Sequence, residues 1–597
     1  MTQGAASIEP AGVRVAAALP VRFIGLSILA LALPAIPFLF PVNSYVVNIF
    51  MQAATYGIAV LGMTIVLGYT GQINLAQAAF FGLGAYAVAL GTVTLGLSFW
   101  VSLLLGIGVA SLAGLVLGLT TLRLGGHYLA MITISFQQIF DLVMVNWTAV
   151  TRGPDGVPGI ARPSLFGHHL ADDKAYLVFC IAVLYAAIGL VWYLPRTRLG
   201  RAMQAIRENE MAAEVTGIKT LVVKVIAFIL CAGLAGIGGA LYAAGFAYVS
   251  PDNFSFKVSI DFLTMALLGG AQSPFGSTLG TALLILLPEW LRFLKEIYLA
   301  AYGIAVILIM VFMPEGIWGI GKTAWQKIRK PRTAKMGAVA PLDLDIPVEG
   351  QAPALHIEGI HKHFGGVSAV DGVDIAVTRG TVHALIGPNG SGKTTMLNVL
   401  NGIYKPTAGR VLVDGQDVTH DAPHVRAGHG MGRTFQNIRL FPNLSVLENV
   451  MVGAQRQHNP IGRSDAALRA RAMSALAFVG MPDKAHMLAK NLPYGHQRLV
   501  EIARALAGHP KLLLLDEPAA GLNQTEKHEL ADLLKRLRGH GVTIFLIEHD
   551  MGLIEQVSDR ISVLNFGRKI AEGAPAEVLR HPGVIAAYLG ENVVAAA

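Results

Sequence analysis

The sequence predicts a polytopic α-helical membrane domain fused to an α/β domain of the P-loop class. Hydrophobic residues make up 53% of the 597 residues and charged residues only 14%, whereas soluble domains carry about 25% charged residues. Up to about residue 320, apolar stretches follow one another, each near the roughly 20 residues that cross a bilayer as a helix. From about residue 354, short apolar strands alternate with helical segments, which is typical of an α/β domain.

These boundaries divide the chain into a membrane domain over residues 1–320, a linker over 321–353 and an α/β domain over 354–597. The linker is rich in Pro, Ala and charge. The formal net charge is +8, but many basic residues flank apolar spans, where membrane topology accounts for them. We therefore expect no binding of nucleic acid. Cys180 and Cys231 both lie in apolar runs and are expected to be packed thiols.

About eight to ten membrane crossings are predicted. The first apolar run resembles a signal peptide, but it is long and further spans follow it, so we interpret it as a membrane helix. The last region, Ile260–Ile320, is interrupted by GGAQSPFGS and PEWLRFLKE and holds either three crossings or two with a re-entrant piece. The other predicted spans are Val21–Phe40, Tyr45–Leu67, Leu75–Leu95, Trp100–Leu122, Tyr128–Trp147, Tyr176–Leu194 and Leu221–Tyr248.

The basic residues predict the orientation of these spans. Arginines precede the first span and follow the fourth and sixth, and lysines and arginines follow the last. By the positive-inside rule these segments are cytoplasmic, and the loop 150–174 lies outside. No charged pair in the spans suggests a clamp for a solute carboxylate or ammonium group.

Several amide and carboxyl side chains fall within or near the predicted spans. Such groups are costly in a membrane unless they are paired or wetted. They either line a solute pathway or form hydrogen bonds between helices, and the sequence does not separate the two. The residues are Gln72, Asn74, Gln77, Gln137, Gln138 and Asp141.

HALIGPNGSGKTTMLNVL contains a phosphate-binding loop between an apolar strand and a helix. Its glycines let backbone N–H groups converge on phosphate oxygens. Lys393 is expected to reach the β- and γ-phosphates, and Thr394 to bind Mg²⁺. The loop residues are Gly387, Pro388, Asn389, Gly390, Ser391, Gly392, Lys393, Thr394 and Thr395.

KLLLLDEPAAGLN places two adjacent acids at the end of a buried strand. Two carboxylates there are costly without a cation nearby. Asp516 is expected to hold Mg²⁺ and Glu517 to polarise the attacking water.

The motifs around these two resemble those of ATP-binding-cassette transporters. LPYGHQRLVEIARAL is similar to the family's signature loop and contributes Gly495. The resemblance implies an ATP hydrolase with Gln436, which also approaches Mg²⁺, and His549 as further catalytic residues, and Phe364 as the aromatic that stacks on adenine. Pro493 stands where the signature usually has Ser, so one hydroxyl contact to phosphate is missing.

RLGRAMQAIRENEMAAEVTGIK is a polar, helix-forming segment between two apolar spans. We interpret it as the coupling helix that docks on a cassette near the Gln436 loop. The alternative is an amphipathic helix lying at the membrane surface.

This segment and GYTGQINLAQAAFFGLGAY resemble the M-type permease of branched-chain amino acid importers, and GRTFQNIRLFPNLSVLENV resembles the G-type ATPase. The resemblance spans nearly the whole chain and implies a natural fusion in the bacterial inner membrane, with the ATPase in the cytoplasm. It also implies partners: a second permease, a second ATP-binding subunit, because one chain carries one cassette, an external substrate-binding protein and the surrounding lipid.

The expected function is ATP-driven import of amino acids, above all branched-chain ones. The alternatives are import of another small solute such as an amide, urea or a small carboxylate, and a membrane-anchored regulatory ATPase that transports nothing. Export is disfavoured because the cytoplasmic loops are short.

Overall fold

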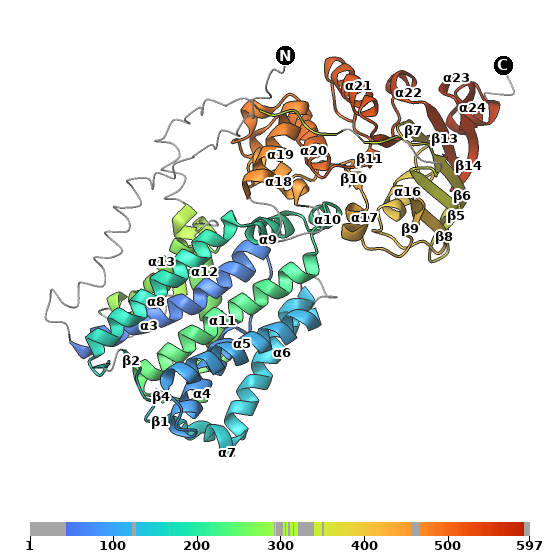
Figure 1. The fold of residues 1–597 in the computed structure, drawn as a ribbon. Coiled ribbons are helices and arrows are strands. Elements are labelled where there is room, and N and C mark those ends of the chain that lie inside the picture. Colours follow the sequence, from blue (N-terminus) through green and yellow to red (C-terminus); the bar gives the residue numbers. More distant parts are fainter. Residues whose placement is uncertain are drawn as a thin grey trace, which may run out of the picture.

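The computed structural model shows a bundle of long helices beside a smaller α/β half (Figure 1). Helices α9 and α10 lie between the two (Figure 1). The predicted first span, Val21–Phe40, most of the linker and part of Ile260–Ile320 fall outside the described residues. The structure describes residues 43–121, 127–165, 168–291, short pieces between 293 and 348, 352–455 and 465–589.

Five helices in the described residues are long and apolar enough to cross a membrane: Ser44–Tyr69, Phe99–Thr120, Tyr128–Asn146, Asp173–Arg196 and Thr220–Phe246. They agree with five of the predicted spans. The bundle consists of α3 (Ser44–Met63), extended by a π-helical turn, α4 (Gln77–Val93), α5 (Phe99–Thr121), α6 (His127–Asn146), α8 (Asp173–Tyr193), α11 (Thr220–Phe246), α12 (Phe256–Gly269) and α13 (Pro274–Leu291).

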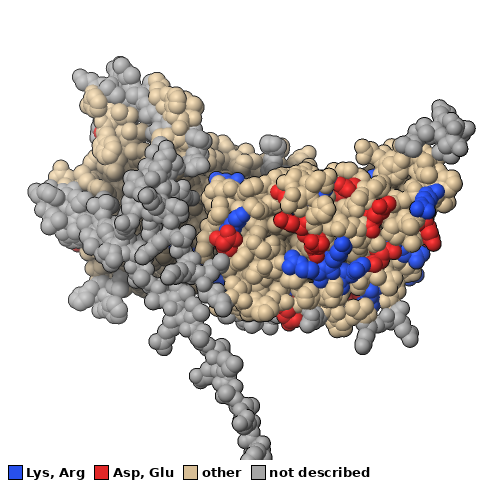
Figure 2. Space-filling view, turned by 90° about the horizontal axis from the view of Figure 1, so that it is seen from above, with Lys and Arg blue, Asp and Glu red and all other residues tan. Residues whose placement is uncertain are grey.

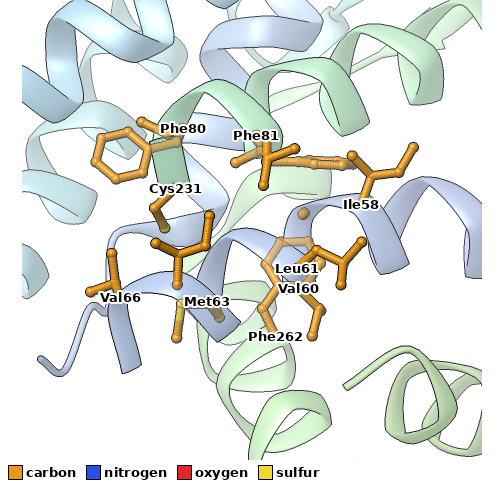
Figure 3. Close-up of a cluster of buried hydrophobic side chains, with 14 of the residues drawn as sticks. Ile58, Val60, Leu61, Met63, Val66, Phe80, Phe81, Cys231 and Phe262 are labelled. Carbon is orange, nitrogen blue, oxygen red and sulfur yellow. The ribbon is translucent and has the colours of Figure 1, made fainter. Parts of the chain in front are cut away.

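Helices α3, α4 and α11 form the centre of the bundle, and their small residues allow close contact. A Cβ at Gly239 would lie 1.8 Å from the carbonyl oxygen of Phe81, so only glycine fits there. Figure 3 shows the cluster that fills this centre, with Phe81 from α4, Cys231 from α11 and Phe262 from α12 around α3. Cys180 and Cys231 are both free and buried, as predicted.

The chain before α4 is not helical, so the predicted span Leu75–Leu95 begins as a helix only at Gln77. Asn74 Nδ2 donates to Gln77 Oε1 over 2.9 Å, and Gln77 Nε2 donates to the carbonyl of Ala59 over 2.6 Å. The first N–H groups of α4 donate to the side chains of Ser259 and Gln137. These buried amides therefore join helices and cap α4. For them, hydrogen bonding between helices is the observed role, rather than lining a solute pathway.

The α/β half contains two sheets. The first has the order β10-β11-β12-β7-β13-β14, parallel except for β14, and the second is antiparallel with the order β6-β5-β8-β9. The strands are β5 (Leu355–Phe364), β6 (Val367–Val377), β7 (Val382–Ile386), β8 (Ala408–Val413), β9 (Gln416–Asp417), β10 (Met431–Arg433), β11 (Leu512–Asp516), β12 (Thr543–Ile547), β13 (Arg560–Asn565) and β14 (Arg568–Gly573).

Helices cover the first sheet, and its central strands are buried on both faces, as parallel strands require. Viewed from above, Lys, Arg, Asp and Glu lie side by side on the surface of this half (Figure 2). The helices are α16 (Lys393–Leu400), α17 (Pro423–Gly428), α18 (Val446–Ala454), α19 (Asp465–Phe478), α20 (Tyr494–Ala507), α21 (Gln524–Gly539), α22 (Met551–Val557), α23 (Pro575–Val578) and α24 (Pro582–Leu589).

The polar segment between the sixth and seventh predicted spans forms α9 (Arg198–Glu208) and α10 (Glu210–Val215). Thr197 and Asn209 cap the two helices through hydrogen bonds to the N–H groups of Gly200 and Ala212. Helix α9 contacts α18, and α10 contacts α17. The segment is thus docked on the α/β half of its own chain.

Candidate functional site

The phosphate loop joins β7 to α16, the strand–loop–helix arrangement that its sequence predicts. Gly387 and Gly392 have φ angles of 152° and 100°. A Cβ at these positions would lie 2.1 Å from the carbonyl oxygen of Leu564 and 2.3 Å from that of Ala369. Glycine is therefore required at both positions, on conformational and on steric grounds. The backbone N–H groups of the loop and the start of α16 make this a site for an anion.

Lys393, the first residue of α16, folds back over the loop. Its Nζ donates to the carbonyl oxygens of Gly387 over 2.7 Å and Pro388 over 2.9 Å. Burial lowers the pKa of the ammonium group, while the nearby Glu517 and Asp516 act in the opposite direction. The positive charge thus lies where the phosphates of a nucleotide would lie. Thr394 and Thr395 follow on α16, with Thr394 exposed.

Asp516 ends the buried strand β11 and is itself 2% exposed. Burial raises the pKa of its carboxyl group, and the Arg433 guanidinium, 3.6 Å away, opposes this. Its Oδ1 has no hydrogen-bond partner among the described residues. A buried carboxylate oxygen with a free lone pair fits a site for a hard cation such as Mg²⁺.

Glu517, Gln436 and His549 come together from three separate parts of the chain. Gln436 Nε2 donates to Glu517 Oε2 over 2.9 Å, and His549 Nδ1 lies 3.7 Å from the same oxygen. Glu517 has a φ of 45°, a left-handed conformation that is strained for a side chain of this size. The structure therefore brings the three predicted catalytic side chains together, with Gln436 and His549 beside the carboxylate of Glu517.

Glu548 is a buried residue beside the site that sequence reasoning missed. Its carboxylate is buried, with Oε1 accepting the N–H of Ala519 over 2.7 Å and Oε2 accepting the N–H of His549 over 2.9 Å. It thus ties the segment after Glu517 to the segment that carries His549. The only signal for it in the sequence is its place beside His549 at the end of an apolar strand.

Phe364 lies at the end of β5 with its ring exposed, as a platform for a base requires. Tyr404 packs edge-on against it, with ring centroids 5.3 Å apart. The Lys362 ammonium lies 4.8 Å from the centroid of the Phe364 ring. Tyr404 was not predicted, and it restrains the orientation of Phe364.

Gly495 belongs to a different part of the α/β half, in the first turn of α20. A Cβ there would lie 2.3 Å from Glu526 Oε1 of α21, so its close neighbours are not residues of the phosphate loop. Pro493 is the N-cap of α20, and no side chain caps this helix. The start of α20 thus presents its N–H groups without the hydroxyl that Ser would add.

The helix that begins at this loop also holds the Gln436 segment. Buried Glu501 accepts the N–H groups of Phe435 and Arg439, each over 3.3 Å. Arg498 donates to Glu501 over 2.8 Å and to the carbonyl oxygen of Gln436 over 2.7 Å. Burial raises the pKa of Glu501, and the two arginines at 498 and 504 oppose that effect. Helix α20 and the Gln436 segment are therefore expected to move together.

Three polar contacts join the membrane half to the α/β half. Glu208 of α9 accepts a hydrogen bond of 2.9 Å from Asn443, which follows the Gln436 segment. Buried Arg201 forms an ion pair with Asp465 of α19. His424 of α17 lies 3.7 Å from Glu214 of α10.

Comparison with known proteins agrees with both halves. Residues 45–314 match the family described as branched-chain amino acid transport system / permease component. Residues 370–520 match the ABC transporter family, and residues 568–594 match the branched-chain amino acid ATP-binding cassette transporter family.

The curated relatives divide in the same way. The chain is 42% identical over 251 residues to the high-affinity branched-chain amino acid transport ATP-binding protein BraF of Pseudomonas aeruginosa, covering 40% of this chain and 98% of BraF. It is 43% identical over 252 residues to LivG of Escherichia coli K12, a protein of the same description, covering 40% of this chain and 98% of LivG. It is 33% identical over 315 residues to the permease protein LivM of Salmonella typhimurium, covering 49% of this chain and 74% of LivM.

The fold, the site and these matches define a membrane protein with an ATP-binding-cassette ATPase attached to a permease. The chain belongs to the branched-chain amino acid ATP-binding cassette transporter family, and it joins in one polypeptide two parts that match separate relatives.

Proposed function

We propose that this chain is the permease and ATPase subunit of an importer that uses ATP to move branched-chain amino acids across the bacterial inner membrane. The observation that carries the proposal is that one chain is similar to a LivM permease and to LivG and BraF ATPases along nearly its full length. The comparisons give no support to urea, amides or small carboxylates as substrates, or to a regulatory ATPase.

ATP is bound at the phosphate loop, with its adenine against Phe364 and its phosphates against the N–H groups of the loop and Lys393. Glu517 polarises the attacking water, because its carboxylate is fixed by Gln436 beside His549. Thr394, Asp516 and Gln436 would hold Mg²⁺, which neutralises phosphate charge when it is bound. Gly495 and the start of α20 serve the ATP site of a second cassette.

The single cassette implies a second ATP-binding subunit, and the single permease half implies a second permease. A substrate-binding protein docks on the side that carries loop 150–174. The cassette lies in the cytoplasm, since it contacts α10 and also α9, which carries Arg198, Arg201 and Arg207.

Helices α9 and α10 act as the coupling element. They are polar, they leave the bundle, and they bind the cassette through Arg201 and Glu208. Closure of two cassettes on ATP displaces these helices and shifts the permease between its outward-open and inward-open states.

The test is uptake by the complete complex in proteoliposomes, with the binding protein outside and ATP inside. We expect saturable, ATP-dependent uptake of radiolabelled leucine, isoleucine and valine. Uptake of urea or a short amide without uptake of leucine would contradict the proposed substrate. ATP hydrolysis that responds to the binding protein without any solute crossing would contradict transport itself.

A further inference from the structure

Two polar stripes run along neighbouring helices of the membrane half. Asn48, Gln52 and Tyr56 are spaced four residues apart on α3, so they share one face of that helix. Lys257 and Asp261 are spaced in the same way on α12. The two helices are packed together, with the rings of Tyr56 and Phe262 4.9 Å apart.

The two stripes meet near the middle of the membrane. Tyr56 lies half-way along the membrane-crossing helix Ser44–Tyr69, and Asp261 directly precedes Phe262, whose ring packs against Tyr56. Sites for transported solutes in membrane transporters are typically found at this depth.

The stripes are not sealed inside the bundle. Asn48, Gln52 and Asp261 are half-buried, and Lys257 is exposed. A charged side chain in contact with lipid at mid-membrane depth is energetically costly. This face of the bundle is therefore expected to meet water or protein rather than lipid tails.

Asp261 lacks a hydrogen-bond or ion-pair partner within the part of the chain that the structure describes, although the Lys257 ammonium one turn away attracts it. Asp141, an acid within the membrane helix α6, differs. It accepts a hydrogen bond of 2.9 Å from Gln137. Structural hydrogen bonding thus accounts for Asp141, which the sequence analysis named, but not for Asp261, which it did not.

We propose that Asp261 and Lys257 bind the charged head of an amino acid on the wall of the transport pathway, with Asp261 facing the ammonium group and Lys257 the carboxylate. This inference rests on the proposed function and names the recognition site within it. The two residues and a zwitterion are complementary in charge. The zwitterion supplies one opposite charge to each residue, so neither ion is left unpaired when the solute binds.

Apolar side chains lie beside this face of α12. Ile260 and Leu267 are 43% and 38% exposed, and with 3.6 residues per turn both lie roughly a third of a turn around the helix from Asp261. Lys257 lies nearer than Asp261 to the start of α12, the end away from the cassette, so a solute arriving from outside meets the ammonium group first. The second permease subunit supplies the opposite wall.

The test compares Asp261→Asn with the wild type in the complete complex, using radiolabelled leucine. Asn has the same size but lacks the charge, so we expect leucine uptake to fall about tenfold or more, the usual effect of losing a hydrogen bond to an ion. ATP hydrolysis in the presence of the binding protein should continue, and Asp261→Glu should restore part of the uptake. Asp252→Asn is the matched control, since Asp252 is an exposed acid just before α12.

The proposed function and the proposed amino-acid site are tested by different measurements. Wild-type uptake of leucine tests the proposed function alone, and the ratio of Asp261→Asn to wild type tests the site. Unchanged uptake in Asp261→Asn would overturn the site while leaving the function intact. Loss of complex assembly in both Asp261→Asn and Asp261→Glu would also overturn it, because Asp261 would then be a contact between subunits. A wild-type complex that carries only an uncharged solute would overturn both.

Discussion

Asn443 Nδ2 donates a hydrogen bond of 2.9 Å to Glu208 Oε1, joining the end of α9 to the loop that follows Gln436. The chain around Gln436 is held by Glu501 of α20, which accepts the N–H groups of Phe435 before it and Arg439 after it. One segment of backbone is therefore fixed to the membrane half on one side and to the signature helix on the other. A displacement of α20 relative to its neighbours has a direct route to α9.

The ion pair between Arg201 and Asp465 is predicted to hold the two halves in register. We expect Arg201→Asp to lower leucine uptake per ATP hydrolysed by about tenfold, because it places two acids together at a partly buried contact. The double variant Arg201→Asp with Asp465→Arg should recover much of the loss. Uptake and phosphate release are measured in the same proteoliposomes.

The matched control for this pair lies within the cassette. Arg410 pairs with Glu358 over 2.7 Å at an exposed position, and Arg410→Asp should leave the ratio of uptake to hydrolysis unchanged. Failure of the double variant to exceed the single one would show that the ion pair does not couple the halves.

Glu517→Gln is predicted to stop hydrolysis while leaving ATP binding intact. Gln keeps an oxygen that can accept the hydrogen bond from Gln436, so the local geometry should persist. It cannot polarise water as a carboxylate does, and we expect steady-state ATP hydrolysis to fall at least about a hundredfold. Binding of a fluorescent ATP analogue and release of phosphate are the two measurements.

An exposed acid on α21, Asp532, provides the control as Asp532→Asn, which should hydrolyse ATP at the wild-type rate. Hydrolysis by Glu517→Gln within threefold of the wild type would refute the role assigned to this carboxylate.

The elements found correctly from the sequence are those set by local patterns. Five membrane helices follow from apolar runs, and the loop around Lys393 follows from glycines between a strand and a helix. The helix start at Gln77 was misplaced by two residues. It depends on Asn74, Ser259 and Gln137, which are far apart in the sequence, and nothing in the local composition reports those hydrogen bonds.

The residues that were missed share one property. Glu548 and Asp261 are ordinary acids in the sequence, and each is singled out only by what surrounds it in three dimensions. Glu548 is buried and binds backbone N–H groups from two segments, whereas Asp261 is half-buried without a bonded partner in the described part. Whether a buried polar group finds a hydrogen-bond partner depends on residues far away in the sequence. It therefore cannot be predicted from the local sequence around that group.

Pro493→Ser is predicted to strengthen the signature loop. Pro493 has φ −57° and ψ 155°, the extended conformation of an N-cap, and its side chain cannot accept the N–H of His496. A serine hydroxyl can, which stabilises α20 by about 1 kcal/mol, partly offset by the lost rigidity of proline. In the proposed complex with a second cassette, that hydroxyl would also meet the phosphates of the second cassette's nucleotide, so we expect the KM for ATP to fall about two- to tenfold.

Pro493→Ala separates the two effects, because it removes the ring without adding a hydroxyl. ATP hydrolysis by the assembled complex is measured against ATP concentration for both variants. Identical KM values for the Ser and Ala variants would show that the hydroxyl makes no contact there.

His383 is predicted to make the cassette less stable in mild acid. It lies on the buried strand β7, where its Nε2 is 2.8 Å from Ser562 Oγ, and burial lowers its pKa from 6.5 to about 4. Between these two values the unfolded chain binds a proton that the folded chain does not, so the free energy of unfolding falls as the pH falls. The loss begins near pH 6.5 and approaches about 3 kcal/mol at pH 4.

The measurement is hydrogen exchange of the β7 amides in the full chain, corrected for the intrinsic effect of pH on exchange, at steps between pH 7 and pH 4.5. His383→Gln is the matched variant, because Gln can still bond to Ser562 and does not titrate. The wild type should lose protection over this range and the variant should lose much less. If the wild type and His383→Gln lose the same amount of protection, the acid sensitivity comes from other groups, because the variant has no His383.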